Sequence, residues 1–273
     1  MPADVRPLGH VLAVANQKGG VGKTTTAINL GAALAATGHR VLIVDLDPQG
    51  NASTGLGVAP ADRRYTAYDL LFDPQGAPAQ AVATTVPGLT IVPATADLAS
   101  ADVDMVADPR RLHKMRDSLA ALADRLGPQD FVLIDCPPSL NLLTLNALVA
   151  ADSLLVPLQC EFFALEGLSQ LIRTVQSVRA ASNPGLRIRG IALTMYDRRN
   201  NLSAQVAADV RENLGALVYE TVIPRNVRLS EAPSHALPAI VYDRTCAGAL
   251  AYQKLAAEIL AQFGREREPA VPA

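Results

Sequence analysis

Short apolar runs alternate with longer stretches of helical periodicity along most of the chain. Continuous apolar runs are typical of strands that are buried on both faces of a parallel sheet. Repeated strand–helix–strand units therefore predict an α/β fold, a mainly parallel twisted sheet covered by helices on both faces. We expect strands at 10–16, 40–47, 88–94, 131–138, 152–158 and 187–196, and helices that include 24–38, 110–126 and 165–181.

The weakest part of this pattern is the segment 57–87, where prolines accompany two short helical pieces. We interpret this segment as an insertion within one domain and not as a boundary between two. We expect a single domain over residues 1–273, with flexible ends at about 1–9 and 265–273.

The composition excludes several classes of protein. Hydrophobic residues make up 49% of the 273 residues, but no apolar run approaches the length of a membrane-spanning helix. The amino terminus has no signal-peptide core, and the three cysteines lie far apart, as is typical of reduced, buried side chains. We therefore expect a cytoplasmic protein without a membrane partner. The net charge of −2 neither favours nor excludes nucleic acid.

The segment NQKGGVGKTTT, residues 16–26, joins the first expected strand to the first expected helix. It ends in Gly22, Lys23 and Thr24, the G-K-[ST] of a phosphate-binding loop. Backbone N–H groups and a helix N-terminus converge in such a loop and favour an anion. The alternative, a glycine-rich turn without a ligand, is disfavoured by the strand before it and the helix after it. We expect Lys23 to reach the β- and γ-phosphates of a nucleotide and Thr24 to hold Mg²⁺.

The loop departs from the ordinary phosphate-loop pattern at its start. Gln17 stands where that pattern has its first glycine, and Lys18 follows it. The chain has four lysines among its 24 basic residues, and two of the four are Lys18 and Lys23. A lysine is a compact point charge suited to phosphate, so we interpret both as placed by function.

Three aspartates lie at the carboxyl ends of expected strands, at the edge of the sheet where α/β proteins bind ligands. Asp45 and Asp47 end the run VLIVDLD, and Asp135 ends FVLID, where a Walker-B aspartate would hold Mg²⁺ through water. Each aspartate also has a structural alternative, because Asp47 begins a good turn and Asp135 could cap the turn before two prolines. Their occurrence together beside a phosphate loop favours the nucleotide interpretation.

Three motifs, KGGVGKTTT, VLIVDLDPQGNAS and VLIDCPPS, resemble those of the deviant-Walker-A ATPases, which have a P-loop NTPase-like fold. More narrowly, DPQGN (47–51), ALEG (164–167) and IPRNVRLSEAPS (223–234) are similar to the ParA/Soj partitioning proteins. The resemblance covers roughly residues 10–263. It implies ATP and Mg²⁺ as cofactors, and slow, partner-stimulated hydrolysis of ATP to ADP and phosphate.

The same resemblance implies a role for each residue of the site. Lys18 would reach the nucleotide of a facing monomer, so that dimerisation depends on ATP. Asp47 would orient the attacking water, with Lys18 and Lys23 as the other catalytic residues. Thr24 and Asp135 would hold Mg²⁺, partly through water, and Asp45 would support the same cluster. The residues expected to bind the nucleotide are Lys18, Gly19, Gly20, Val21, Gly22, Lys23, Thr24, Thr25 and, near adenine, Pro224 and Arg225.

Family members bind DNA without sequence specificity, and this chain carries a local excess of arginine. Residues 173–228 contain nine arginines against four carboxylates. A positive face is the footprint expected for phosphate binding, although arginines on a long surface segment can also be merely solvated. We expect the DNA backbone to be contacted by Arg198, Arg199, Arg225 and Arg228.

The resemblance thus implies a cytoplasmic, nucleoid-associated ATPase whose ATP-bound homodimer binds double-stranded DNA. A ParB-like protein would stimulate hydrolysis and release the dimer, which drives chromosome or plasmid segregation. The alternative is a positioning ATPase with the same chemistry for another cargo, such as a protein cluster or a microcompartment. Relatives with an operator-binding extension, a basic membrane helix or cluster cysteines are disfavoured because we find none of these features in the sequence.

Overall fold

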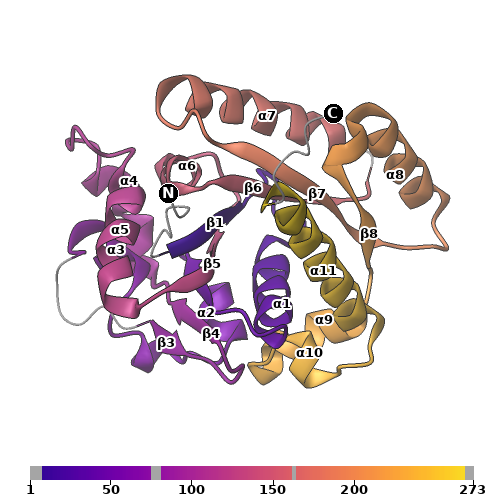
Figure 1. Cartoon of the computed structure of the whole chain (residues 1–273), viewed down its shortest axis with the longest axis horizontal. Coiled ribbons are helices and arrows are strands. Elements are labelled where there is room, and N and C mark those ends of the chain that lie inside the picture. Colours follow the sequence, from indigo (N-terminus) through magenta and orange to yellow (C-terminus); the bar gives the residue numbers. More distant parts are fainter. Residues whose placement is uncertain (1–7, 75–80, 162–163, 268–273) are drawn as a thin grey trace.

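The computed structural model describes residues 8–74, 81–161 and 164–267 of the chain (Figure 1). The strands are β1 (Leu8–Val14), β2 (Val41–Asp45), β3 (Val82–Ala83), β4 (Leu89–Val92), β5 (Gln129–Asp135), β6 (Ser153–Gln159), β7 (Arg187–Tyr196) and β8 (Val218–Pro224). These strands form one sheet in the order β3-β4-β2-β5-β1-β6-β7-β8. Neighbouring strands are parallel except β3 and β4, which are antiparallel. The predicted α/β fold with a mainly parallel sheet is confirmed.

Helices cover both faces of the sheet (Figure 1). They are α1 (Lys23–Ala36), α2 (Asn51–Gly55), α3 (Ala67–Phe72), α4 (Ala101–Asp104), α5 (Lys114–Leu126), α6 (Leu142–Ala150), α7 (Ala164–Ala181), α8 (Asn201–Leu214), α9 (Val227–Glu231), α10 (Ala239–Tyr242) and α11 (Ala247–Arg267). On β1, Val11 and Ala13 belong to the core beneath α5, α6 and α7, whereas Leu12 and Val14 belong to the core beneath α1 and α11. Side chains alternate between the faces of a strand, so a strand between two cores is apolar throughout.

The register of the central strands aligns the segments that carry the expected site. Val14, the last residue of β1, lies opposite Asp135 of β5, and Asp135 lies opposite Asp45 of β2. β1 has β5 on one side and β6 on the other. Ligands of open α/β sheets bind outside the carboxyl ends of the strands where the strand order changes direction. The loop after β1 and the aspartates of β2 and β5 therefore share the edge at which a ligand is expected.

The two ends of the described chain differ from the expected bounds. The first strand begins at Leu8, two positions before the expected start. Helix α11 continues to Arg267, into the segment that we expected to be flexible. The other residues of the two expected flexible ends, 1–7 and 268–273, lie outside the described residues. Among the described helices, none combines the length and the apolar character that crossing a membrane requires.

The segment 57–87 contains the two short helical pieces that the sequence predicts, η1 (Pro60–Asp62) and α3. Helix α3 begins with a capping box, in which the N–H of Asp69 donates to the hydroxyl of Thr66 and the N–H of Thr66 donates to the carboxylate of Asp69. Such reciprocal bonds satisfy two N–H groups that the helix leaves open. The segment also holds β3, which the sequence did not predict, and residues 75–80 lie outside the described ranges.

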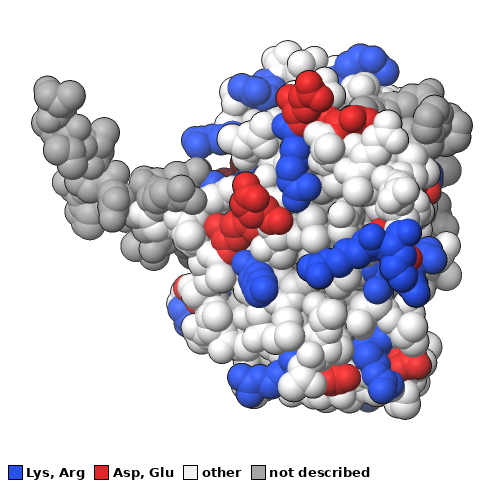
Figure 2. Space-filling model, turned by 90° about the vertical axis from the view of Figure 1, so that its right-hand side faces the viewer, with Lys and Arg blue, Asp and Glu red and all other residues white. Residues whose placement is uncertain are grey.

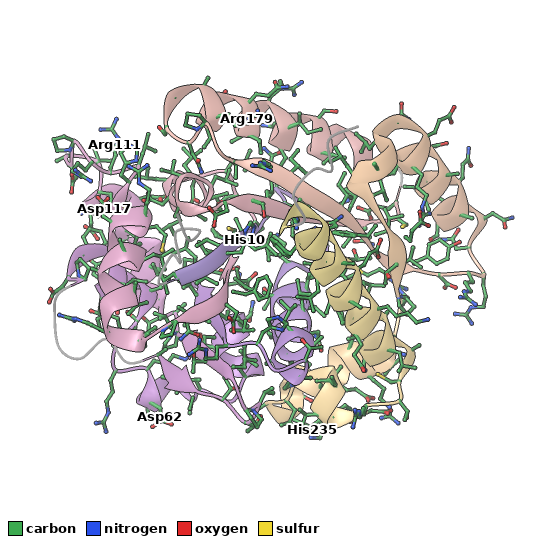
Figure 3. The ribbon with its side chains drawn as sticks, viewed as in Figure 1. His10, Asp62, Arg111, Asp117, Arg179 and His235 are labelled. Carbon is green, nitrogen blue, oxygen red and sulfur yellow. The ribbon has the colours of Figure 1, made fainter. Side chains whose placement is uncertain are left out.

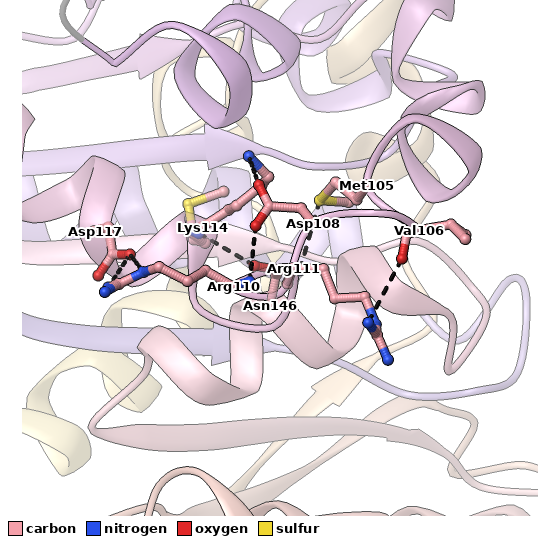
Figure 4. A network of polar contacts seen from close by, with 9 residues as sticks. Met105, Val106, Asp108, Arg110, Arg111, Lys114, Asp117 and Asn146 are labelled. Carbon is pink, nitrogen blue, oxygen red and sulfur yellow. Dashed lines mark hydrogen bonds and ion pairs between the residues drawn. The ribbon is translucent and has the colours of Figure 1, made fainter.

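The helix predicted at 110–126 begins only at Lys114. Asn146 of α6 holds the preceding turn, because its side-chain amide donates to the carbonyl oxygen of Arg111 at 2.7 Å (Figure 4). An ion pair between Lys114 and Asp108, with nitrogen and oxygen 2.7 Å apart, closes the same turn. The contact of Asn146 with Arg111 joins segments distant in the sequence, so helical periodicity alone does not reveal it.

Candidate functional site

The loop between β1 and α1 is shaped by two glycines in the left-handed region. Gly20 has a φ of 75° and Gly22 a φ of 88°, a conformation that residues with a Cβ rarely adopt. Gly22 directly precedes α1, and its carbonyl accepts the N–H of Thr26 at 2.8 Å, which begins the helix. The first N–H groups of a helix have no partner within it, so the start of α1 favours an anion in this loop.

Lys23 is turned into the loop and is only 7% exposed. Its ammonium group donates to the backbone carbonyl of Lys18 at 2.9 Å, so the side chain spans the turn from inside. Burial lowers the pKa of Lys23, and the negative charge of Asp135 is the largest influence that opposes this shift. A buried cation held by a carbonyl and facing carboxylates has the position expected of a phosphate ligand.

Asp135 is fully buried at the end of β5. Neither of its carboxylate oxygens has a hydrogen-bond partner in the described part of the chain. Burial raises the pKa of Asp135 well above its ordinary value, and the nearby charge of Asp45 raises it further, while the hydroxyl of Thr24 opposes the rise. Buried carboxylates without partners are uncommon. This one fits a ligand that brings its own donors, such as a hydrated Mg²⁺ beside the Thr24 hydroxyl.

The residues present are suited to Mg²⁺ only together with a nucleotide. In the ranges that the structure describes, no three His, Cys, Asp or Glu side chains gather closely enough to hold a metal ion. Mg²⁺ usually keeps several waters and is bound by one or two protein oxygens plus the phosphates of a substrate. The hydroxyl of Thr24 and the carboxylate of Asp135 match such a site.

Asp45 is also fully buried, but its oxygens are occupied. Its Oδ2 accepts the N–H and the hydroxyl of Ser53 at 2.8 and 2.6 Å, and its Oδ1 accepts the N–H of Asp47 at 3.3 Å. Burial raises the pKa of Asp45 to about 6. The carboxylate of Asp45 therefore holds the backbone that carries Asp47, a more specific role than the support of the metal cluster that we expected.

Asp47 lies in the loop after β2 and is 8% exposed. Its Oδ1 accepts the N–H of Gln49 at 3.0 Å, and its carbonyl accepts the N–H of Gly50 at 2.9 Å, so the predicted turn is present. The negative charge of Asp47 also opposes the lowering of the pKa of Lys23 by burial. Asp47 thus forms the turn and also lies near Lys23. Its part in the turn therefore does not exclude a role beside the nucleotide.

Lys18, by contrast, lies on the outside of the loop, where its side chain is 43% exposed. Its ammonium group forms an ion pair with Glu161, which follows β6. Its backbone N–H donates to the side chain of Asn16 at 3.1 Å, and Asn16 donates to the carbonyl of Pro157 on β6 at 2.8 Å. The two loop lysines therefore occupy different environments, one inside the loop and one at its surface.

The remaining loop residues are fixed by neighbours that the sequence analysis missed. Val21 follows Gly19 and Gly20 and is buried, and its carbonyl accepts the hydroxyl of Thr194 on β7 at 2.8 Å. Thr25 lies in the first turn of α1, where its carbonyl accepts the side-chain amide of Asn29 at 2.8 Å. A single polar residue at the end of an apolar strand, as in TMY or VAN, is the signal that could have identified Thr194 and Asn16.

The expected adenine contacts lie where β8 ends, beside β7. Pro224 is the last residue of β8, and the N–H of Arg225 donates to the carbonyl of Tyr196 at 3.0 Å. The next residue, Asn226, has a buried side-chain oxygen without a hydrogen-bond partner in the described residues. The sequence analysis did not single out Asn226, whose unused acceptor fits a ligand with N–H donors.

The four expected DNA-binding arginines are exposed and lie in two segments. Arg198 and Arg199 lie in the turn between β7 and α8, whereas Arg225 lies just before α9 and Arg228 lies at its start. Arg199 is 90% exposed and pairs with Asp197 at 3.3 Å.

Arg228 is paired more extensively than Arg199. One of its nitrogens lies 2.9 Å from Glu231, another lies 3.5 Å from Asp243, and the guanidinium carbon lies 5.9 Å from the centre of the Tyr242 ring. Two of the arginines counted along the sequence, Arg199 and Arg228, are thus already paired with nearby acids.

The nine arginines of residues 173–228 do not form one positive face. Arg179 on α7 and His235, which follows α9, lie at opposite ends of the molecule (Figure 3). Arg189 on β7 is half-buried, with its guanidinium carbon 3.7 Å from the centre of the Phe263 ring. Basic and acidic side chains are interspersed on the side of the molecule that carries α8 (Figure 2). The local excess of arginine is therefore divided among several surfaces.

The loop between β1 and α1 has the shape that binds the phosphates of a nucleotide. By its fold and its site, the protein is a P-loop ATPase. Residues 9–188 match the family described as AAA domain. The chain is 58% identical over 259 residues to the chromosome partitioning protein ParA of Caulobacter vibrioides (strain NA1000 / CB15N), which covers 95% of this chain and 96% of that protein. It therefore belongs to the ParA/Soj family of chromosome-partitioning ATPases.

Two further similarities support the family and the fold, respectively. The sporulation initiation inhibitor protein Soj of Bacillus subtilis (strain 168) is 51% identical over 254 residues, covering 93% of this chain and 99% of that protein. A crystal structure of cobyrinic acid a,c-diamide synthase from Mycobacterium smegmatis with bound ADP and magnesium has a TM-score of 0.81 and 39% identity, covering 97% of this chain and 99% of that one. The P-loop NTPase-like fold expected from the sequence is confirmed.

Proposed function

We propose that this protein is an ATP- and Mg²⁺-dependent DNA-partitioning ATPase that works as an ATP-bound homodimer. The observation that carries the proposal is the division of labour between the two lysines of one loop. Lys23 is buried and faces Asp135 and Asp47, whereas Lys18 lies at the surface, where a second molecule can reach it. The relative that is 58% identical and named as a chromosome partitioning protein supports the biological role.

In the proposed reaction, the protein residues position and stabilise charge. Lys23 and the N–H groups of the loop bind the β- and γ-phosphates. Mg²⁺, when bound, neutralises charge that develops on the phosphates. Thr24 would hold this ion directly and Asp135 would hold it through water. Asp47 accepts a hydrogen bond from the attacking water and orients it, and Asp45 fixes the loop of Asp47 through the N–H at 3.3 Å.

In the proposed dimer, Lys18 leaves Glu161 and contacts the nucleotide of the facing monomer. Two nucleotides that face each other are strongly repulsive at low dielectric, and a cation between them lowers this repulsion. An exposed ion pair such as Lys18–Glu161 contributes only up to about 1 kcal/mol, so a polyanionic nucleotide competes with it effectively. Dimerisation thereby depends on ATP.

The ATP-bound dimer, in this proposal, binds double-stranded DNA through phosphate contacts of Arg198, Arg199, Arg225 and Arg228. A ParB-like partner stimulates slow hydrolysis and thus releases the dimer from the nucleoid. The single sheet of eight strands supports one ATPase domain. The alternative, a positioning ATPase for another cytoplasmic cargo, uses the same site and differs only in its partner.

Replacing each loop lysine with alanine tests the division of labour. Lys23→Ala removes the buried phosphate ligand, so we expect nucleotide affinity to fall by about 100-fold, since hydrogen bonds to charged groups contribute roughly 1.5–3 kcal/mol. Lys18→Ala should leave nucleotide binding by the monomer within about threefold of the native value but abolish the ATP-dependent dimer. Nucleotide titration and sedimentation with ATP measure the two effects separately.

Lys254→Ala, at an exposed position on α11, is the control and should behave as the native protein in both measurements. A Lys18→Ala protein that dimerises normally with ATP would contradict the role across the dimer.

A further inference from the structure

Arg63 lies in the segment 57–87, directly after η1, and its guanidinium group is directed at the loop that follows Asp47. Its Nη1 donates to the carbonyl of Ala94 at 2.8 Å, at the carboxyl end of β4. Its Nη2 donates to the hydroxyl of Thr54 on α2 at 2.8 Å. Its Nε and Nη2 both donate to the carbonyl of Val58, at 3.2 and 3.1 Å. One side chain thus joins the C-terminal end of α2 and the segment after it to the end of β4.

The same guanidinium group lies against Gly50, the residue that precedes α2. A Cβ at Gly50 would clash with Nη1 of Arg63 and would lie 3.0 Å from the carbonyl oxygen of Ala94. Gly50 has a φ of 63°, and its N–H donates to the carbonyl of Asp47 at 2.9 Å. The turn that carries Asp47 is therefore in contact with Arg63 at Gly50.

A second connection reaches the same residue, Ala94, through its N–H. The N–H of Ala94 donates to the hydroxyl of Ser53 at 3.0 Å, and that hydroxyl donates to Asp45 at 2.6 Å. Asp45 in turn accepts the N–H of Asp47 at 3.3 Å. Ala94 is thus bound through its N–H to Ser53 and through its carbonyl to Arg63. The two connections hold α2 and the Asp47 turn to the end of β4.

We infer that Arg63 is a positioning residue for Asp47 in ATP hydrolysis. The inference rests on the proposed function, in which Asp47 orients the attacking water. A planar guanidinium group can donate in several fixed directions at once, whereas a lysine ammonium group cannot reproduce this fork. Displacement of a catalytic group by about 1 Å can lower a rate by about 100-fold. Loss of the fork should therefore lower the turnover number while the phosphate loop continues to bind nucleotide.

The test compares four variants of the full chain: Arg63→Ala, Arg63→Lys, Arg64→Ala and Asp47→Ala. Arg64 is the matched control because it is adjacent and exposed. ATP hydrolysis at saturating ATP, the dissociation constant for ADP and the melting temperature are measured for each variant. Rates are compared well below every melting temperature, so that a lower fraction of folded protein does not account for a lower rate.

We expect Arg63→Ala to lower kcat by at least about tenfold, and Arg63→Lys to lower it by about threefold or more, with ADP affinity within about twofold of the native value. Arg64→Ala should match the native protein. Native kcat in both Arg63 variants, together with abolished hydrolysis in Asp47→Ala, would overturn the inference and leave the proposed function intact. Equal losses of kcat and ADP affinity would also overturn it, because they would show general damage to the site.

If Arg63→Ala does not fold, Arg63→Lys decides by the same criteria. Normal hydrolysis by Asp47→Ala would instead overturn the proposed role of Asp47, and the inference about Arg63 with it.

Discussion

At the carboxyl edge of the sheet, charged groups are buried and incompletely paired, whereas beside α8 and α9 they are exposed and paired with one another. Asp135 has no hydrogen-bond partner in the described residues, and the ammonium group of Lys23 donates to a backbone carbonyl. Arg199 and Arg228, on the other surface, each contact a carboxylate of a neighbouring residue. In the first region a ligand can supply the missing hydrogen bonds and charges. In the second region a ligand must replace the ion pairs that the arginines already form.

The difference in burial also sets the size of each effect. Interactions between buried charges are weakly screened, whereas exposed pairs are screened by salt and contribute little. A substitution at the buried edge should therefore have a large effect on chemistry, and a single substitution on the arginine surface a smaller effect on binding. The predictions follow this order.

The largest effect is expected for Asp135→Asn. The amide cannot hold Mg²⁺ as a carboxylate does, so hydrolysis should fall by at least about 100-fold, a scale typical of lost charge stabilisation in an active site. The free protein should become more stable at neutral pH, by about 1 kcal/mol, because the raised pKa of buried Asp135 costs free energy that a neutral amide does not. Steady-state hydrolysis and chemical unfolding without nucleotide measure the two. Unchanged hydrolysis, or a destabilised free protein, would contradict the account of this edge.

The same buried carboxyl groups predict a pH dependence of the free protein. Burial raises the pKa of Asp45 from 3.8 to about 6, so the folded state holds a proton that the unfolded chain has lost between these values. The free energy of unfolding should therefore fall as pH rises from about 4 to about 6, and rise again as pH falls. In Asp135→Asn, which lacks the second buried carboxyl group with a raised pKa, this fall should be smaller. Chemical unfolding at several pH values, without nucleotide, tests the sign.

A smaller effect is expected for Arg228→Glu and Arg199→Glu. Each change should weaken DNA binding about tenfold for all sequences alike and make the logarithmic salt dependence shallower by about one unit, because a phosphate contact is lost. Titrations of unrelated DNA at several salt concentrations, with ATP present, measure both quantities. Arg179→Glu, on α7 at the other end of the molecule, is the control (Figure 3). If Arg179→Glu weakens binding as much as Arg228→Glu, the DNA surface lies elsewhere.

The smallest effect is expected when an arginine is released from its carboxylate. Glu231→Gln removes the charge 2.9 Å from Arg228, and Asp197→Asn does the same for Arg199. Each should strengthen DNA binding by about twofold to fivefold, since an exposed pair contributes up to about 1 kcal/mol. Weaker binding in either variant would show that these acids orient the arginines instead of competing with DNA.

The sequence predicted the buried edge well because motif, strand and helix coincide there. The order of apolar runs gave the sheet, and the aspartates at the ends of these runs fell at one edge because parallel strands align their carboxyl ends. The sequence did not show that Asp45 is fully engaged by Ser53 and Asp47, since those bonds depend on where α2 packs.

The arginine surface was predicted less well, and for a physical reason. A count along the sequence sums charges that lie apart in the fold. The guanidinium group of Arg189 packs on the Phe263 ring, and Arg179 lies on the side of the molecule opposite to His235 (Figure 3). The elements α8 and β8 were not predicted either, although Asn200 caps the start of α8 and Gly215 follows its end. Likewise, Arg63 looked like part of an insertion, since its acceptors Ala94 and Val58 are backbone carbonyls that any sequence provides.

The most direct test of the central claim is DNA binding by Asp47→Ala in ATP and in ADP. The substitution removes the carboxylate that orients water but leaves Lys18, Lys23 and the Mg²⁺ ligands in place. The account predicts an ATP-bound dimer that hydrolyses at least about 100-fold more slowly than the native protein and stays on DNA in ATP, with no binding in ADP. Equal DNA binding in ATP and ADP, or hydrolysis at the native rate, would contradict it.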